Sequence, residues 1–485
     1  MAVEILGTNL VDKFSINFTN IINIDRTYEI NNIEPLKLLN FRRLDIVIKY
    51  LYIRSVELAV DSDYYKNLYL AHIKAFNNYV EADNSGKVGP DSFIQSFKTL
   101  HSELKKEGFS DQFPIPLSRE GIPLDGAHRI ASSMLLENKV QTVVLDADSP
   151  CFDYDFFKSR GVKSSYLDAV SLEYAYLNAD TRAVIIWPTA KGQQDKLEQI
   201  LKKYGDIVYF KEVYLNKTGA HNFTAIAYKR EPWVGSQVSG YPGAINKANW
   251  CFENSGPLRV FLFESTQDLI AMKDEIRDIF KVGKHSIHIN DTHEETIEIT
   301  QTLFNDNSIT FLNSMVHRQF NWFNRLFTHY QTWISENNYN PKQFCIDGSG
   351  TLASFGIRDV RDLDFLYSGS DVPKTGFKEI DCHNSQQQHE NLTADDIIFN
   401  PENYFYYSGH KFVSIKLIKA LKQKRNEVKD QHDVIAINAI LSGKKVNEPF
   451  LAKCKKVLSI PFVKAKIKLV LLKLRYYLTL IKKGR

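Results

Sequence analysis

Hydrophobic positions follow a helical period in the first part of the chain and a strand period further on. Between residues 35 and 104 apolar residues recur every three or four positions, which predicts a series of helices. Short apolar runs bounded by turn residues then predict strands at 115–117 and 142–145, with a helix beginning near Ala127 between them. This order indicates a small mixed α/β unit after a helical region.

The alternation of strands and helices continues through the middle of the chain. Apolar runs predict strands in AVIIW, DIVYFKEVYL, LRVFLF and HSIHI, and amphipathic patterns predict helices in QQDKLEQILKKYG and IAMKDEIRDIF. A single aromatic-rich helix is predicted in NSMVHRQFNWFNRLFTHYQTWISENN. The segment QFCIDGSGTLASFGIRDVRDLDFLYSGSDV then predicts a strand, a tight turn, a short helix and a second strand, and the last helices are expected from around Lys411.

The pattern and the length together predict a multidomain protein of the α/β (mixed α+β) class. The chain has 485 residues, of which 44% are hydrophobic and 24% charged, as in an ordinary globular protein of about three domains. We expect a helical N-terminal region, a first α/β unit, a central α/β domain without an assigned role, a last α/β unit and a basic apolar C-terminal helix, at residues 1–90, 91–180, 181–338, 339–450 and 451–485.

Cysteine usage and hydropathy indicate a cytoplasmic protein. The five cysteines lie far apart with no CxxC pair, so neither a disulfide framework nor a zinc ribbon is predicted. The N-terminal segment lacks the basic and apolar pattern of a secretory signal. No uncharged apolar run reaches the ~18 residues that span a bilayer.

The net charge of +4 is unevenly placed along the chain. Residues 451–485 carry eleven Lys and Arg and no acidic residue, which leaves 50 basic against 57 acidic residues elsewhere. A mildly acidic body argues against a duplex DNA partner. Two interpretations of the basic C-terminal helix stay open: peripheral contact with an anionic inner membrane, or docking on the protein itself with lysine heads reaching solvent.

The strongest chemical signal is a glycine and a serine followed by two spaced aspartates. Gly348 and Ser349 precede Asp362 and Asp364 by about a dozen residues, and the two aspartates lie two apart on a predicted strand. Their side chains therefore leave the same face, close enough to share divalent metal ions. Gly348 permits close approach of a phosphate to the backbone, and the Ser349 hydroxyl can donate to it. This arrangement suits nucleotidyl or phosphoryl transfer.

These segments, IDGS at 346–349 and DLDF at 362–365, resemble the signature of the polymerase-beta-like nucleotidyltransferase superfamily over about a hundred residues. Asp347 stands where that signature usually has an apolar residue. The resemblance implies that Gly348 and Ser349 bind the phosphates of an NTP and that the two aspartates bind Mg²⁺ or Mn²⁺. It also implies a third catalytic, metal-binding carboxylate on a later strand, for which Asp381 is the candidate, with Glu379 on the same predicted face.

The helix SIKLIKALKQKRNEVKDQHDVIAI resembles one that often follows such a catalytic core. In that resemblance Lys419, Arg425 and Lys429 hold substrate phosphates. The alternative is a solvated helix face with ordinary ion pairs.

A second signal is the phrase PIPLSREGIPLDGAHRIASSMLL. Asp125 and Gly126 end a strand, and His128 and Arg129 begin a helix, so an imidazole, a guanidinium and backbone N–H groups are expected to converge on an anion. The phrase resembles the D-G-x-H-R-x-x-A box of the ParB and sulfiredoxin superfamily, which implies a nucleotide- or phosphate-binding domain at 91–180. Ala127 stands where sulfiredoxin chemistry needs a cysteine, so a small-metabolite kinase is the activity implied, with His128 catalytic. The alternative is a capped helix with a structural Asp–Arg pair.

A third cluster, KHSIHINDTHEET, holds three histidines and three acidic residues. It has the ligand types of a metal site, but a strand running into a helix capped by Asp291 or Thr292 is the expected structure. Nearby aromatic residues, Trp187, Trp233, Trp250 and Tyr241, can stack on a base or a sugar ring, with core packing as the default.

Taken together, the sequence predicts a metal-dependent nucleotidyl- or phosphotransferase, with a possible second role as a small-metabolite kinase. The resemblances favour bacterial surface-polysaccharide biosynthesis, with a nucleotide and a small-molecule or glycan acceptor as partners. Three alternatives stay open: a toxin-type nucleotidyltransferase that modifies tRNA or protein, a non-catalytic nucleotide-binding regulator, and an enzyme in which only the first phosphate pocket is active and the other serves as a scaffold.

Overall fold

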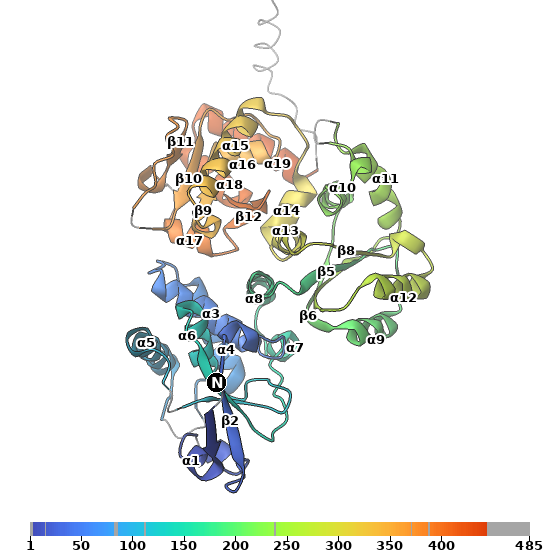
Figure 1. Cartoon of the computed structure of the whole chain (residues 1–485). Coiled ribbons are helices and arrows are strands. Elements are labelled where there is room, and N and C mark those ends of the chain that lie inside the picture. The colour runs from blue at the N-terminus through green and yellow to red at the C-terminus, as the bar shows by residue number, and fades with distance from the viewer. Residues whose placement is uncertain are drawn as a thin grey trace, which may run out of the picture. The chain divides into compact units, whose positions relative to one another are not determined.

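The computed structural model describes residues 3–14, 16–81, 86–110, 113–236, 239–369, 371–386 and 389–443. These residues form helices and several small sheets, so the expected mixed α/β class is confirmed (Figure 1). The chain divides into two compact units, Met1–Ile418 and Lys419–Arg485. No helix within the described ranges is long and apolar enough to cross a membrane. The predicted C-terminal helix at 451–485 lies outside the described residues.

The first sheet has the order β1-β2-β4-β3, with β3 parallel to β4 and the other neighbours antiparallel. Its strands come from both sides of the predicted boundary at residue 90. The strands and helices of this part are β1 (Val3–Leu6), α1 (Gly7–Val11), α2 (Ile16–Thr19), β2 (Thr27–Ile33), the 3₁₀ helix η1 (Pro35–Leu38), α3 (Leu44–Glu57), α4 (Tyr64–Asn77), α5 (Pro90–Glu107), β3 (Ile115–Leu117), α6 (Ala127–Leu136), β4 (Val140–Val144), α7 (Tyr154–Ser159) and α8 (Ser164–Leu177).

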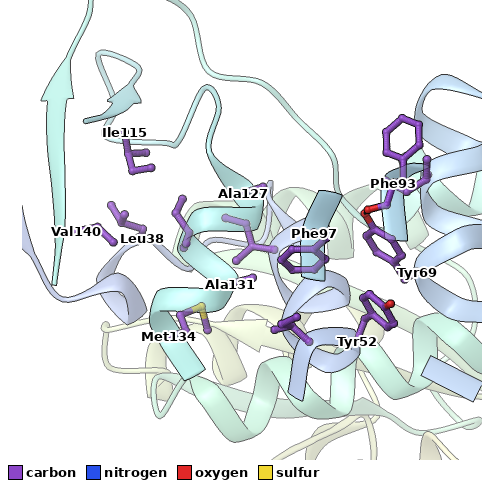
Figure 2. Packing of buried hydrophobic residues seen from close by; sticks show 14 of the residues in the cluster. Leu38, Tyr52, Tyr69, Phe93, Phe97, Ile115, Ala127, Ala131, Met134 and Val140 are labelled. Carbon is purple, nitrogen blue, oxygen red and sulfur yellow. The ribbon is translucent and has the colours of Figure 1, made fainter. Parts of the chain in front are cut away.

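Helices α3 to α6 enclose an aromatic and aliphatic core beside this sheet (Figure 2). Tyr52 of α3 stacks on Tyr69 of α4 with ring centroids 4.7 Å apart, and Phe97 of α5 lies against both rings. On α6 the small residues Ala127 and Ala131 face this core. Burial of these apolar surfaces is the main source of stability for this part of the chain.

The second sheet has the order β6-β7-β5-β8, and all its neighbours are antiparallel. Helices α9 and α12 cover one face of this sheet (Figure 1). The leucines of α9 pack with Met272 and Ile276 of α12 in a core that includes the strand residues Val184 and Ile186. The elements are β5 (Thr181–Ile186), α9 (Gln194–Tyr204), β6 (Asp206–Val213), α10 (Lys217–Ala227), η2 (Pro232–Val234), α11 (Pro242–Cys251), β7 (Leu258–Glu264), α12 (Ile270–Phe280), η3 (Gly283–His285), β8 (Ile287–Ile289), α13 (His293–Leu303) and α14 (Asp306–Ser314).

The third sheet has the order β11-β10-β9-β13-β12. Strand β10 is antiparallel to β9 and parallel to β11, while β13 is parallel to β9 and antiparallel to β12. The elements are α15 (Asn321–Glu336), η4 (Pro341–Gln343), β9 (Phe344–Ile346), α16 (Ser349–Ser354), β10 (Leu363–Tyr367), β11 (Ile380–Cys382), η5 (Asn384–Gln386), α17 (Ala394–Phe399), β12 (Tyr404–Tyr407) and β13 (His410–Val413), followed by α18 (Ile415–Arg425) and α19 (Val428–Leu441).

Four local predictions were wrong. The strand expected to end at Asp125 and Gly126 is reduced to a single bridge between Leu117 and Pro123, and the helix predicted at 414–437 is two helices separated at Asn426, whose φ is 52°.

The aromatic-rich helix begins at Asn321 and not near Asn313, since α14 ends at Ser314 and the Val316 N–H donates to the carbonyl of Phe355. Gly356 permits this contact, since a Cβ there would lie 2.2 Å from the Val316 carbonyl oxygen. Helices also do not begin at Lys411, which lies in β13; the last helices begin at Ile415.

Candidate functional site

A tight turn after β9 leads directly into the short helix α16. Gly348 precedes α16 with a φ of 60°, a conformation that favours glycine. A Cβ on Gly348 would lie 3.5 Å from Asp364 Oδ2, and one on Gly350 would lie 2.5 Å from the Ile346 side chain. The turn therefore lies beside the Asp364 carboxylate, and α16 packs closely on β9.

Two carboxylates lie on one face of the neighbouring strands β10 and β11, and a third lies just before β10. Asp364 pairs directly with Asp381 across the parallel ladder, so the two side chains leave the same face. Asp362 lies two residues before Asp364, in the bend that precedes β10, and the intervening Leu363 is buried. Asp364 thus lies beside both Gly348 and Asp381, and Asp362 is near enough to raise its pKa.

Ser349 lies at the same turn and donates its hydroxyl to the backbone carbonyl of Asp362 at 3.2 Å. The backbone N–H of Asp347 donates to the carbonyl of Asp364 at 2.9 Å. These two hydrogen bonds join the turn to the start of β10. They hold the aspartates and the glycine in a fixed relation.

The electrostatics of Asp364 follow from its position among the other acids. Burial is the largest cause that raises its pKa, to about 6. His383 works in the opposite direction, with its Nδ1 4.0 Å from Asp364 Oδ2. Repulsion from Asp362, Asp347 and Asp381 raises the pKa further. Negative charge is therefore concentrated at this point of the sheet.

The side chains present at this site are of the type that binds a hard divalent cation. Carboxylate oxygens are the ligands that Mg²⁺ and Mn²⁺ prefer, and a cation would offset the repulsion among the three aspartates. No group of three or more His, Cys, Asp or Glu side chains in the described part of the chain is already arranged around a common metal position. Binding therefore requires Asp362 and Asp381, which are both exposed, to turn toward Asp364.

A buried contact between a histidine and the aspartate of the glycine turn was not predicted from the sequence. His389 Nε2 lies 3.0 Å from Asp347 Oδ1, and both side chains are almost fully buried. The same carboxylate accepts the N–H of Gly348 at 2.6 Å. Asp347, which replaces the usual apolar residue, therefore fixes the glycine turn. The histidine lies 42 residues away in a polar stretch, and no local pattern connects the two.

The cations of the second unit are held by neighbouring acids. Arg425 donates from Nε and Nη2 to the carboxylate of Asp430 at 2.7 and 2.6 Å, and these hydrogen bonds hold the pKa of Asp430 well below its usual range. Lys429 Nζ lies 3.1 Å from Glu427 Oε2. Lys419 is half-buried on α18. Within this unit the predicted phosphate-binding side chains of Arg425 and Lys429 are thus engaged in local ion pairs.

The DGAHR segment forms the expected glycine turn and helix start. Gly126 precedes α6 with a φ of 80°, and Asp125 before it is exposed. Arg129 donates from Nη1 to the carbonyl of Phe113. His128 lies in the aromatic core instead, with Nε2 3.0 Å from the Tyr69 hydroxyl and its ring 4.5 Å from that of Phe97. Burial holds the pKa of His128 well below its usual value.

A buried polar network next to this turn was also missed by sequence reasoning. Arg43 and Lys49 both donate to the Asp45 carboxylate, at 2.9 Å each, and Lys49 Nζ lies 3.3 Å from His72 Nε2. Arg43 also donates to the carbonyl of Pro123, three residues before the glycine turn. Burial lowers the pKa of Lys49. These residues occupy helical positions that read as ordinary core or surface in the sequence.

The third cluster forms the capped helix that was expected in place of a metal site. Thr292 and Glu295 form a reciprocal capping box at the start of α13. His288 is packed between Trp187 and Tyr228, and burial lowers its pKa to about 3. His293 hydrogen-bonds the carbonyl of Ala175 at 2.7 Å. These side chains stabilise the fold of the central region.

No protein-family model, curated protein or solved structure matches the chain. The structure itself defines the fold class: a mixed α/β protein with several small sheets. The nucleotidyltransferase and ParB/sulfiredoxin resemblances, and the domain boundaries drawn from them, stay predictions.

Proposed function

We propose that the chain is a metal-dependent nucleotidyl- or phosphotransferase whose reaction centre is formed by Asp362, Asp364 and Asp381. The observation that carries this proposal is the pairing of Asp364 with Asp381 on parallel strands, beside the Gly348 turn. Carboxylates concentrated next to a glycine turn supply both the metal ligands and the open backbone that a polyphosphate needs. The substrate proposed for this site is an NTP.

In this proposal each residue has a distinct task. Asp362 and Asp364 hold Mg²⁺ or Mn²⁺, and cations bound there would offset the charge that develops on the entering and leaving oxygens. Gly348 lets the phosphates approach the backbone without a side chain in the way. Asp381 Oδ1 accepts the N–H of Cys382 at 2.8 Å. Its Oδ2 is the atom assigned to receive the proton of the acceptor hydroxyl.

The acceptor proposed is a small molecule or glycan in bacterial surface-polysaccharide biosynthesis, by analogy with the family that the signature resembles. Peripheral contact with an anionic inner membrane belongs to the same setting. The DGAHR turn is proposed as a second phosphate site by the same kind of resemblance, since the Arg129 guanidinium lies beside Gly126 at the start of α6. A kinase role for that site requires His128 to leave its contact with Tyr69.

The test is transfer of label from each radiolabelled NTP, in the presence of Mg²⁺ and a cell extract that supplies the acceptor. We expect Asp364→Asn to abolish transfer, whereas Asp371→Asn, an exposed carboxylate of the same region, leaves it intact. Loss of transfer in His128→Ala alone would move the reaction centre to the DGAHR site. Nucleotide binding without any transfer would favour the regulator. Label on tRNA or protein, with the chain retained on tRNA at roughly physiological salt, would favour the toxin-type enzyme.

A further inference from the structure

Two neighbouring cavities lie within the first unit, away from the aspartates. The first has a volume of about 790 Å³ and is lined by α10, α13, α14 and the turn between β12 and β13. The second has a volume of about 800 Å³ and is lined by the start of α10, by α11 and by the chain after it. Each is within the size range of sites that hold small organic ligands.

The two cavities share part of one wall. Asn222, Met315 and His317 line both of them. The Asn222 amide donates to the carbonyls of Leu312 and Met315 at 2.8 and 3.1 Å, which fixes this wall in place. A ligand of more than one ring could therefore contact both sides of this wall only by passing its edge.

His317 is the unusual member of the shared wall. Neither ring nitrogen has a hydrogen-bond partner, and both are closed off from solvent. The ring contacts those of His221 and Tyr241, with centroids 5.5 and 5.0 Å away. Burial lowers the pKa of His317 to about 4, so at neutral pH the ring has one donor and one acceptor. A buried group with both capacities unused carries a free-energy penalty that a hydroxyl ligand would remove.

The two cations that line the first cavity, Lys229 and Arg230, are already paired with carboxylates. Lys229 forms an ion pair with Glu298, and Arg230 donates to the Thr292 hydroxyl at 3.0 Å and lies 3.5 Å from Glu295. An anionic ligand would have to compete with these carboxylates. The cavity therefore offers little attraction for a charged molecule.

Aromatic rings, amides and hydroxyls make up much of the remaining lining, together with aliphatic side chains and, in the second cavity, Lys217. Tyr176, Tyr241 and Tyr407 line the first cavity together with Gln301 and Gln331. The second is lined by Asn249, Asn254 and Ser255, with the exposed Tyr214 ring at its edge. A sugar ring presents an apolar C–H face for aromatic packing and hydroxyls that both donate and accept, so it matches this lining.

We propose that the paired cavities bind an uncharged oligosaccharide, with sugar rings on both sides of the wall formed by Asn222 and His317. Rings in the first cavity pack on its tyrosines, and a hydroxyl reaches the His317 imidazole after a small rotation of that ring. Rings in the second cavity bind the amides of Asn249 and Asn254. The proposal does not depend on the metal-binding role of the aspartates.

The test measures binding of neutral trisaccharides built from glucose, mannose, galactose or N-acetylglucosamine to the full chain, by saturation-transfer NMR and calorimetry without nucleotide or divalent cation. Tripolyphosphate and a hyaluronan oligosaccharide serve as charged probes. We expect at least one neutral trisaccharide to bind. Its Kd should rise tenfold or more in His317→Ala, and likewise in Asn249→Trp, which fills the second cavity from an exposed position. His432→Ala, an exposed histidine in the second unit, should bind like the wild type.

Three results would overturn the proposal. One is the absence of binding by every neutral trisaccharide. Another is binding that neither His317→Ala nor Asn249→Trp weakens, which would place the ligand elsewhere. The third is tighter binding of a charged probe that these variants abolish, which would give the cavities a different ligand class. Thermal unfolding of each variant separates loss of binding from loss of folding. If His317→Ala does not fold, the binding result for Asn249→Trp alone tests the proposal.

Discussion

Asp364 on β10 and Asp381 on β11 lie directly opposite each other on parallel neighbouring strands. Two carboxylates at one ladder position destabilise a sheet unless something offsets their charge, because like charges directly across a pair repel. Burial is the main cause of the raised pKa of Asp364, and repulsion from the neighbouring aspartates adds to it. Such a cost in stability is expected where carboxylates are crowded for a function, as in the cation site proposed above.

The first prediction concerns the thermal stability of this crowded site. Asp364→Asn removes one charge from the cluster, so without divalent cations its melting temperature should equal or exceed that of the wild type. Added Mn²⁺ should raise the melting temperature of the wild type and have little effect on the variant, since ligand binding stabilises only the state that binds. Differential scanning calorimetry with and without Mn²⁺ measures both effects. An equal Mn²⁺ response in wild type and variant would contradict the assignment, and Asp371→Asn serves as the control.

The second prediction concerns the buried pair of Asp347 and His389. His389→Leu leaves the Asp347 carboxylate buried without its imidazole partner, which should lower the free energy of unfolding by about 3 kcal/mol. The double variant Asp347→Leu, His389→Leu should recover part of that loss, because no buried charge is left unpaired. Urea unfolding of the single and double variants gives the coupling. Additive effects would show that the pair makes no specific contribution.

The two pairs, Asp364 with Asp381 and Asp347 with His389, differ in how much of each could be predicted from the sequence. Strands, turns and the spacing from Gly348 to Asp364 are local features, and the sequence predicts them because alternation and turn residues act over a few positions. The choice of Asp381 over Glu379 depends on register: Asp381 lies within β11 opposite Asp364, whereas Glu379 precedes the strand and its carbonyl accepts the Leu363 N–H.

What the sequence could not predict are contacts between distant polar residues. Asp347 and His389 carry no local pattern, and the buried network of Arg43, Asp45 and Lys49 lies within a helix whose apolar face is not well separated. Such groups are buried only because tertiary packing brings partners to them. The two cavities are tertiary features in the same sense, since their walls come from helices far apart in the sequence.

The third prediction separates the packing role of His128 from a chemical one. His128→Phe keeps an aromatic ring against Phe97 but removes the partner of the Tyr69 hydroxyl, which retains a long contact of 3.5 Å to the carbonyl of Phe93. We expect a loss of about 1–2 kcal/mol for Phe and a larger loss for Ala, which also leaves a cavity. Chemical denaturation measures both.

Transfer activity measured on the same two variants completes this test. A purely structural His128 predicts activity in His128→Phe wherever the protein is folded. A folded but inactive His128→Phe would assign the imidazole to the chemistry of the DGAHR site. Because burial holds the pKa of His128 well below its usual value of 6.5, the unfolded chain takes up a proton there first, so the wild type should lose stability relative to His128→Phe as the pH falls from 8 to 6.

The last prediction concerns Glu173 of α8, which joins three segments of the first unit. Its carboxylate accepts from Arg54 of α3 at 2.5 Å and from Lys342 of η4 at 3.1 Å, and it is almost fully buried. Burial alone would raise the pKa of Glu173, but attraction to Arg54 and Lys342 outweighs burial and lowers it to about 2. Glu173→Gln leaves two buried cations without their counter-charge and should cost about 3–5 kcal/mol.

The pH dependence of this contribution has a defined sign. Because the pKa of Glu173 is lower in the folded chain than its ordinary value of 4.5, the ion pairs stabilise the fold fully above pH 4.5. The stabilisation, about 3 kcal/mol, is lost as the pH falls toward 2, since the unfolded chain then binds the proton more readily. Urea unfolding at pH 7 and pH 4 should therefore show a smaller difference between wild type and Glu173→Gln at the lower pH. The exposed Glu253→Gln should show no difference at either pH, and an unchanged gap for Glu173→Gln would mean that its carboxylate does not titrate with folding.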